Sequence, residues 1–252
     1  MNAEIIARLE ASFGSGASSR LNWLMSEILS DSEKLSASLI AERIGEENAV
    51  LTSKIFSGSE EPSFAYLDRV AAYLAVDGEW LKRGVGAPFR VSHQREYGKT
   101  LAKKLIESPA KKITLVRSAS AAGEVAIALQ YDSFRCEVLE TTLHLSHHIG
   151  SGGEGDAAKF STTCEALWSA RKGSVNSVAM TPDNFQRLVS GNGHALSLIA
   201  RSDYQSWFDD WWDPSMFMHR NDPDQYWTGY REFCIRIRKA REIDDRQNGQ
   251  AY

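Results

Sequence analysis

The sequence predicts two structural units, an N-terminal bundle made only of helices followed by a C-terminal α+β domain. Between residues 18 and 90, apolar residues recur every three or four positions, which is typical of short amphipathic helices. From residue 112 onwards, short apolar runs typical of strands are mixed with longer helical patterns. A chain of 252 residues is long enough for two domains. We therefore place them at 18–90 and 112–245, with tails at 1–17 and 246–252.

The N-terminal unit divides into short helical segments with clear stop signals. A first helix is expected over 20–29, and a second begins near Ser36 and ends at Gly45, which can adopt the left-handed conformation that closes helices. A third segment follows over 47–57, and Pro62 opens a further helix with Leu67, Val70 and Leu74 on its apolar face. Trp80 and Leu81 are expected to pack back on this bundle.

A basic segment separates the two units. Residues 91–117 carry seven Lys or Arg against two Asp or Glu, whereas residues 1–90 carry nine against 13 and residues 118–252 carry 13 against 18. Tyr97, Leu101 and Leu105 have helical spacing within this segment, and Ser108-Pro109 ends the pattern. We interpret 91–111 as a basic linker or helix, with a solvated charged face as the simplest role and contact with DNA as the alternative.

The C-terminal unit alternates strand and helix patterns. Strands are predicted over 113–116, 125–131 and within 134–145, and a further strand is predicted over 195–200. Helices are predicted over 156–171, from Thr181-Pro182 to just before Gly191, and from Asp222-Pro223 onwards. These patterns indicate an α+β domain.

Three pieces of the N-terminal unit resemble one known family. Leu35-Ser36-Ala37-Ser38-Leu39-Ile40-Ala41-Glu42-Arg43-Ile44-Gly45 resembles the first helix and turn of the lambda-repressor/Cro (XRE-type) helix-turn-helix. The stretch Ser53-Lys54-Ile55-Phe56-Ser57-Gly58 resembles the end of the family's recognition helix, and Tyr66 to Gly84 resembles the run that follows it in phage-type repressors. The resemblance covers about a third of the chain and implies a lambda-repressor-like helix-turn-helix bundle that binds DNA.

The resemblance implies which residues meet DNA. In this family the second helix crosses the phosphate backbone and the third enters the major groove with its first residues at base edges. Asn reads adenine, Glu accepts from cytosine, and Lys or Ser hold phosphates without specifying sequence. The expected DNA-contacting residues are Ser36, Ser38, Glu47, Asn48, Ala49, Thr52, Ser53 and Lys54.

The sequence departs from the family in three ways. Ala37 stands where the family often has a Gln that contacts the DNA backbone, and one extra residue lies between Gly45 and Gly58. The unit is also net acidic, which is unfavourable because phosphate neutralisation supplies most non-specific affinity. For Glu47 a base contact and simple stabilisation of the positive helix start remain equal alternatives.

Nothing in the sequence predicts catalysis, a metal or a cofactor. Ala122-Gly123 resembles the cleavage site of self-cleaving repressors, but no Ser–Lys pair follows that would activate a nucleophile. His144 and His148 would share a face if they lay on a helix, and the glycine-rich run 150–155 lacks the ending of a phosphate loop and is interpreted as a flexible loop. We therefore expect no enzyme activity.

Cellular context and partners follow from composition. Three separated cysteines fit a reducing compartment, and neither a signal peptide nor an apolar run of spanning length is present, so a cytoplasmic protein without membrane contact is expected. An aromatic concentration lies between Trp207 and Tyr230; it fills a core or lines a pocket or subunit interface.

The expected function is a sequence-specific transcriptional regulator, a phage- or plasmid-type repressor that binds double-stranded DNA as a homodimer on a pseudo-palindromic operator. Its C-terminal domain would dimerise or sense a small-molecule or protein effector. The alternative is an antitoxin-like protein that binds DNA and also a partner protein through its C-terminal domain.

Overall fold

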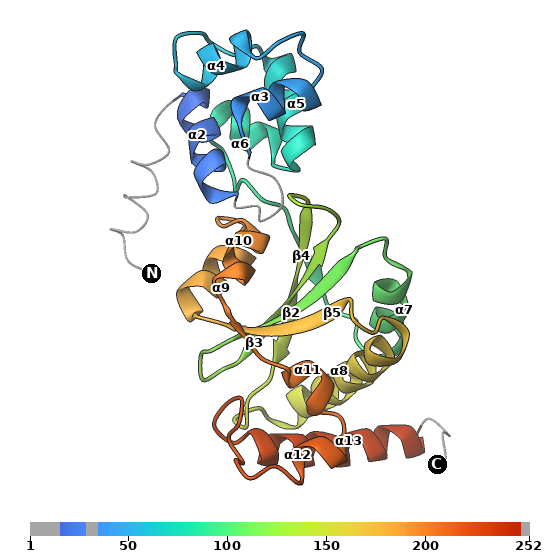
Figure 1. The fold of residues 1–252 in the computed structure, drawn as a ribbon. Coiled ribbons are helices and arrows are strands. Elements are labelled where there is room, and N and C mark those ends of the chain that lie inside the picture. Colours follow the sequence, from blue (N-terminus) through green and yellow to red (C-terminus); the bar gives the residue numbers. More distant parts are fainter. Residues whose placement is uncertain (1–15, 29–34, 248–252) are drawn as a thin grey trace.

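The computed structural model describes residues 16–28 and 35–247, which form two regions stacked end to end (Figure 1). The helical region, up to residue 83, contains α2 (Ala17–Glu27), α3 (Ala37–Arg43), α4 (Val50–Phe56), α5 (Phe64–Leu74) and α6 (Gly78–Arg83). The sheet region, from residue 91, contains a six-stranded mixed sheet with helices on both faces. The predicted order of an all-helical part before an α+β part is therefore confirmed.

The helices of the helical region begin where the sequence supplies a cap. The side chains of Ser36, Ser63 and Asp77 each accept a hydrogen bond from a backbone N–H in the first turn of α3, α5 and α6. One core joins all five helices, and Trp80 and Leu81 lie in it as predicted. Its fully buried side chains include Leu21, Leu24, Ile40, Val70 and Leu81.

The sheet pairs strands that are far apart in the chain. Its order is β1 (Val91–Gln94), β4 (Cys136–His144), β3 (Glu124–Gln130), β2 (Lys112–Ser118), β5 (Val175–Met180) and β6 (Asp203–Tyr204). The β2–β3 and β3–β4 pairs are antiparallel hairpins, whereas β1 runs parallel to β4 and β5 parallel to β2. Because side chains alternate along a strand, Leu115 and Val116 enter different cores on opposite faces.

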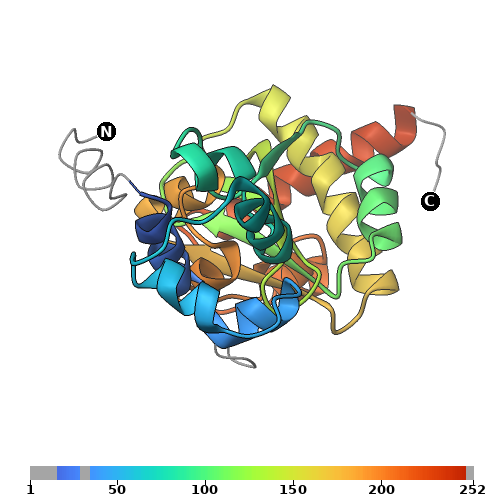
Figure 2. The same cartoon turned by 90° about the horizontal axis from the view of Figure 1, so that it is seen from above.

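The two faces are covered unequally. One face packs against α7 (Lys99–Glu107), α8 (Ser151–Ala170), α11 (Trp207–Asp210), α12 (Pro214–Phe217) and α13 (Tyr230–Gln247), which share the largest core. On the other face, the helices of the described residues that share a core with the sheet are α9 (Pro182–Val189) and α10 (Ala195–Ala200). Seen from above, the helical region overlies α9 and α10, with α7, α8 and α13 to the other side (Figure 2).

Several sequence expectations for the sheet region are wrong. Residues 195–200 form helix α10 and not a strand; a short apolar run satisfies either period, and packing over Val178 decides it. The glycine-rich run is the start of α8 and not a loop, because Glu154 in the first turn is held by Arg236 of α13 at 2.7 Å. The last helix begins only at Tyr230, since residues after Pro223 form turns.

The segment expected as a basic linker or helix contains β1 and α7. Helix α7 buries Leu101 and Leu105 against α8, which agrees with the helical spacing in the sequence. Strand β1 was not predicted, because its four residues show no burial pattern until they pair with β4.

The histidines and aromatics also have defined places. His144 ends β4, while His147 and His148 lie in the following turn, so no helix carries them on one face. The aromatic concentration mostly fills the chain's own core; its buried members are Trp207, Phe208, Trp211, Phe217, Trp227 and Tyr230. Of the alternatives left open by the sequence, a core holds for these six side chains, whereas Met216 and Met218 are exposed.

The packing around Gly123, which belongs to the sequence that resembles a cleavage site, explains why a glycine stands there. Its φ is +62°, and a Cβ there would lie 2.4 Å from the Leu145 carbonyl oxygen and 2.5 Å from Arg117 Nη2. Only glycine lets the Arg117 guanidinium approach the backbone at this turn.

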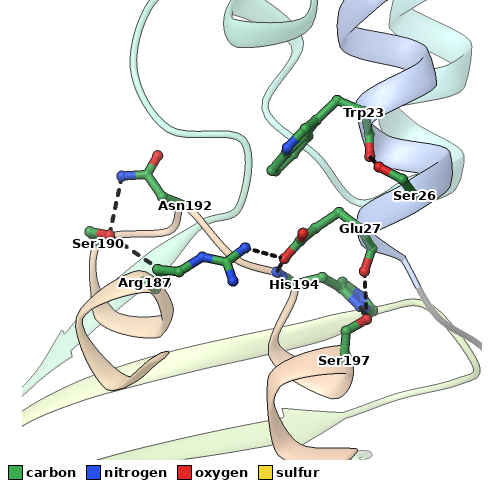
Figure 3. A network of polar contacts seen from close by, with 8 residues as sticks. All are labelled: Trp23, Ser26, Glu27, Arg187, Ser190, Asn192, His194 and Ser197. Atoms are coloured by element: carbon green, nitrogen blue, oxygen red, sulfur yellow. Dashed lines mark hydrogen bonds and ion pairs between the residues drawn. The ribbon is translucent and has the colours of Figure 1, made fainter. Parts of the chain in front are cut away.

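A polar network joins the two regions at the carboxyl end of α2 (Figure 3). Glu27 Oε1 accepts from Arg187 Nη2 at 2.8 Å and from the backbone N–H of His194 at 3.1 Å, while Ser197 Oγ donates to the Glu27 carbonyl at 2.6 Å. His194 is buried, and its Nε2 lies 2.9 Å from the Phe134 carbonyl. Because that carbonyl can only accept, Nε2 carries the hydrogen.

Apolar contacts surround this network. The Trp23 ring lies 6.1 Å from Phe89, which lies 5.3 Å from His194, and Tyr73 lies 6.0 Å from Phe134. Phe134, in the β3–β4 turn, is buried in the core of the helical region. The two regions are thus joined by side chains of α2 and α5 on one side and of the β3–β4 turn, α9 and α10 on the other.

None of the helices in the described parts of the chain is both long enough and apolar enough to span a bilayer.

Candidate nucleic-acid interface

Helices α3 and α4 are joined by a short, sterically defined turn. Ser36 Oγ accepts from the Leu39 N–H at 3.2 Å and starts α3. After Ile44 the chain reverses at Gly45, whose φ is +80°, and the Glu46 N–H donates to the Ala41 carbonyl at 2.9 Å. This bond satisfies a carbonyl at the end of α3, so the turn is closed without side chains.

Asn48 and α2 fix the two ends of α4. The Asn48 carboxamide oxygen accepts from the Val50 N–H at 2.9 Å, so this side chain satisfies the first N–H of α4 from the turn before the helix. At the other end Ser18 Oγ donates to the Ile55 carbonyl at 2.7 Å and Asn22 Nδ2 donates to the Phe56 carbonyl at 2.8 Å. These bonds satisfy carbonyls that a helix end leaves without partners. Helix α4 is therefore held by α2 from below and lies at the end of the molecule far from the sheet (Figure 1).

Most residues expected to meet DNA are accessible on these two helices and the turn. Ser38, Glu47, Asn48, Ser53 and Lys54 are exposed. Ser36 and Ala49 are half-buried, the first because its hydroxyl caps α3.

The prediction that Thr52 contacts DNA is wrong. Its side chain is fully buried, and its Oγ1 accepts a hydrogen bond from the Tyr66 hydroxyl at 3.1 Å. Burial raises the pKa of Tyr66, against the lowering effect of that bond, so the phenol stays protonated and able to donate. Thr52 therefore fastens α4 to α5 and faces away from solvent, as does its apolar neighbour Ile55.

The charges around α4 have both signs. Lys54 and Arg43 are exposed cations on α4 and α3, but Arg69 of α5 forms an ion pair with Glu46. Exposed carboxylates also occur nearby in sequence, at Glu42, Glu47, Glu60 and Glu61. A phosphate approaching α4 would gain from Lys54 and lose from Glu47, so few cations are available for non-specific attraction.

Exposed apolar side chains on this surface were not anticipated. Val50 and Leu51 of α4 are 60% and 39% exposed, and Phe64 at the start of α5 is 67% exposed. The helical period explains the exposure once the burial of Thr52 and Ile55 is known, because Val50 and Leu51 then turn outward. Such side chains can contact a thymine methyl group or a protein surface.

Comparison of the chain with protein-family models, with characterised proteins and with solved structures found no match.

Proposed function

We propose that this protein is a sequence-specific DNA-binding transcriptional regulator of the phage- or plasmid-type repressor class. The observation that supports this proposal is the pair of short helices α3 and α4, with a turn at Gly45, which carries the exposed Asn48, Ser53 and Lys54; α4 lies at the end of the molecule far from the sheet (Figure 1). In this proposal α4 enters the major groove and the start of α3 meets the phosphate backbone.

Each proposed contact has its own chemistry. The Asn48 amide offers a donor beside its acceptor, which is the pattern that reads adenine, and Lys54 supplies a mobile cation for a phosphate. Glu47 either accepts from a cytosine amino group or stabilises the helix start. The acidic surroundings make a single helical region a weak binder, so two copies on a pseudo-palindrome, with half-sites about 34–36 Å apart, are part of the proposal.

The first test is selection of bound duplexes from a random pool, followed by binding of variants to the selected site at fixed salt. Asn48→Ala should cost about 1 to 3 kcal/mol and relax one base preference. Asn48→Ser keeps an oxygen that can cap the Val50 N–H, so an equal loss in both variants assigns the effect to the missing amide and not to a frayed helix.

The cation is tested separately. Lys54→Ala should weaken binding to every sequence alike and lower the salt dependence, whereas Lys239→Ala, which makes the same charge change at an exposed position of α13, should leave binding unchanged. If Asn48 and Lys54 variants bind like the parent, α4 is not the recognition helix.

The homodimer is tested by light scattering on the full chain. Exposed Met216 and Met218 remain available for pairing, whereas variants of the buried aromatic side chains would unfold the domain. A monomer at the concentrations where DNA binds would contradict the pairing part of the proposal.

A second candidate function is protein binding, as in an antitoxin that neutralises a partner. The exposed Val50, Leu51 and Phe64 favour it, because α4 and the start of α5, which the Thr52–Tyr66 bond joins, both carry exposed apolar side chains. Selection of no duplex, together with loss of partner binding in Phe64→Ser, would favour this function over DNA recognition.

A further inference from the structure

The face of the sheet that carries α9 and α10 is only half covered. Both helices pack over Val116, Ala126 and Met180, towards one end of the strands. At the other end a cleft of about 600 Å³ lies between α10, the β3–β4 turn and the strands β2, β3 and β5. This volume is in the range of sites that hold small organic ligands.

The floor of the cleft offers hydrogen-bonding groups. Thr114 Oγ1 donates to Asn176 Oδ1 at 2.7 Å, which leaves the Asn176 amide hydrogens for another acceptor. Gln130 Nε2 donates to the Asp132 carbonyl at 3.0 Å, and its own oxygen remains an acceptor. Covering such polar groups costs free energy unless they form hydrogen bonds. These groups therefore favour a ligand that can donate to them and accept from them.

The mouth of the cleft is positively charged. Lys111 and Lys112 are exposed at its edge, and neither forms an ion pair within the described residues. The one acidic group in the lining, Asp132, is occupied: its carboxylate accepts from the Phe134 and Arg135 N–H groups at 2.9 and 2.7 Å and pairs with the Arg135 side chain. The cleft therefore attracts an anion.

The remaining wall is apolar and aromatic. Leu196, Ile199 and Ala200 of α10 line one side with Val178 of β5. Tyr204 of β6, 67% exposed, lies at the border. A flat hydrocarbon or aromatic body fits such a wall, with its acidic group at the lysines.

Two walls of the cleft, α10 and the β3–β4 turn, also hold the helical region. Helix α10 lines the cleft with Leu196 and Ile199 and binds α2 through Ser197 and the Glu27 carbonyl. The β3–β4 turn lines it with Asp132 and Ser133 and places Phe134 in the core of the helical region. The His194–Phe134 hydrogen bond ties the two walls together (His194 in Figure 3).

We propose that this cleft binds a small planar organic anion, bearing a carboxylate, sulfonate or phosphate group, and that its occupancy alters the packing of α2 through α10 and the β3–β4 turn. A ligand that fits between the walls fixes their separation, and that separation sets the geometry of the contacts to Glu27 and Tyr73. The proposal goes beyond DNA binding and does not require it.

Binding is tested with anilinonaphthalene sulfonate, a planar aromatic anion whose fluorescence rises in apolar sites. The native protein should bind it with one saturable site, and the uncharged analogue phenylnaphthylamine should bind more weakly. Lys111→Glu with Lys112→Glu should weaken sulfonate binding by about tenfold or more, because two attractive charges become repulsive. Ala200→Trp, which fills the wall without changing charge, should also abolish the signal.

The matched control is Lys99→Glu with Lys103→Glu, an equal charge reversal on exposed residues of α7. Loss of sulfonate binding in this control, or undiminished binding in both cleft variants, would show that the dye binds elsewhere and would overturn the site.

Coupling is tested by amide hydrogen exchange in residues 17–27, with and without saturating dye. Exchange in α2 should change on binding, whereas exchange in the middle of α8, on the opposite face, should not. Ser197→Ala should still bind the dye and show a smaller change in α2, because the contacts through Glu27 and the β3–β4 turn remain. Dye binding without any effect on α2, or an effect that is undiminished in Ser197→Ala, would overturn the coupling through α10.

Discussion

The helical region and the sheet region each contain a buried arginine whose guanidinium donates hydrogen bonds to backbone carbonyls and not to a carboxylate. Arg20 of α2 donates to the Leu81 and Lys82 carbonyls at the end of α6, each at 2.9 Å. Arg117 of β2 donates to the Leu145 carbonyl from two of its nitrogens, at 3.0 and 2.9 Å, and to the Ser118 carbonyl at 3.0 Å. Both side chains are almost inaccessible to water.

The two arginines differ in the size of their pKa shift and in the number of elements that they join. Burial lowers the pKa of Arg20, and it lowers that of Arg117 to about 10, where the Glu124 carboxylate partly opposes it. Arg117 also lies 4.2 Å from the Trp227 ring and needs Gly123 beneath it. The arginine of the helical region caps one helix, whereas that of the sheet region joins β2, β4 and the carboxy-terminal aromatic core. A single change should therefore damage the sheet region more.

The largest expected effect tests this difference directly. Arg117→Met leaves the Leu145 and Ser118 carbonyls buried without donors, and we expect a loss of about 3 kcal/mol in the free energy of unfolding. Arg20→Met, which orphans carbonyls only at a helix end, should cost about 2 kcal/mol. Urea denaturation of both variants measures the two values; a larger loss for Arg20→Met would reverse the comparison.

A smaller effect is expected where the two regions meet. Glu27→Gln keeps the shape of the side chain but removes the charge that faces Arg187 at 2.8 Å, at a cost of about 1 to 2 kcal/mol. Because the network joins the regions, we also expect the single unfolding transition to broaden or divide as the helical region unfolds first. Glu61→Gln, an exposed site in the same region, is the control and should leave the transition unchanged. An unaltered transition in Glu27→Gln would show that apolar contacts alone join the regions.

The smallest effect is a dependence on pH at the same interface. Burial lowers the pKa of His194 from 6.5, although the Phe134 carbonyl and the Glu27 carboxylate oppose that shift. The unfolded chain then takes up a proton near pH 6.5 that the folded chain accepts only at lower pH. Stability is therefore present above pH 6.5 and declines as the pH falls below it, by at most about 1.4 kcal/mol per pH unit.

His194→Gln removes this titration and should flatten the decline, whereas His219→Gln, at an exposed position, should not. Thermal unfolding between pH 7.5 and 5 measures both slopes, with the charged neighbours Glu27 and Arg187 unchanged. A decline that persists unaltered in His194→Gln would assign it to carboxylates elsewhere.

The start and the end of α3 could be predicted from the sequence because each depends on only a few neighbouring residues. Ser36 starts α3 through its side-chain oxygen and Gly45 closes it through its positive φ, and both effects act within one turn of the chain. Thr52 was misjudged because its burial comes from the Tyr66 hydroxyl, 14 residues away, and no local pattern reports that contact.

Local patterns in the sequence predicted the division into a helical part and an α+β part, the starts of α3, α5 and α9, and the exposure of Asn48, Ser53 and Lys54, since periodicity and capping act over a few residues. Contacts between distant segments set the remaining features. Strand β1 exists because β4, more than 40 residues later, supplies its hydrogen-bond partners. The run 195–200 is a helix because it packs over Val178, and the aromatic side chains became core because α8, α11 and α13 enclose them. Each of these outcomes depends on contacts between distant segments, whose free energy exceeds the small preferences that a short stretch of sequence carries.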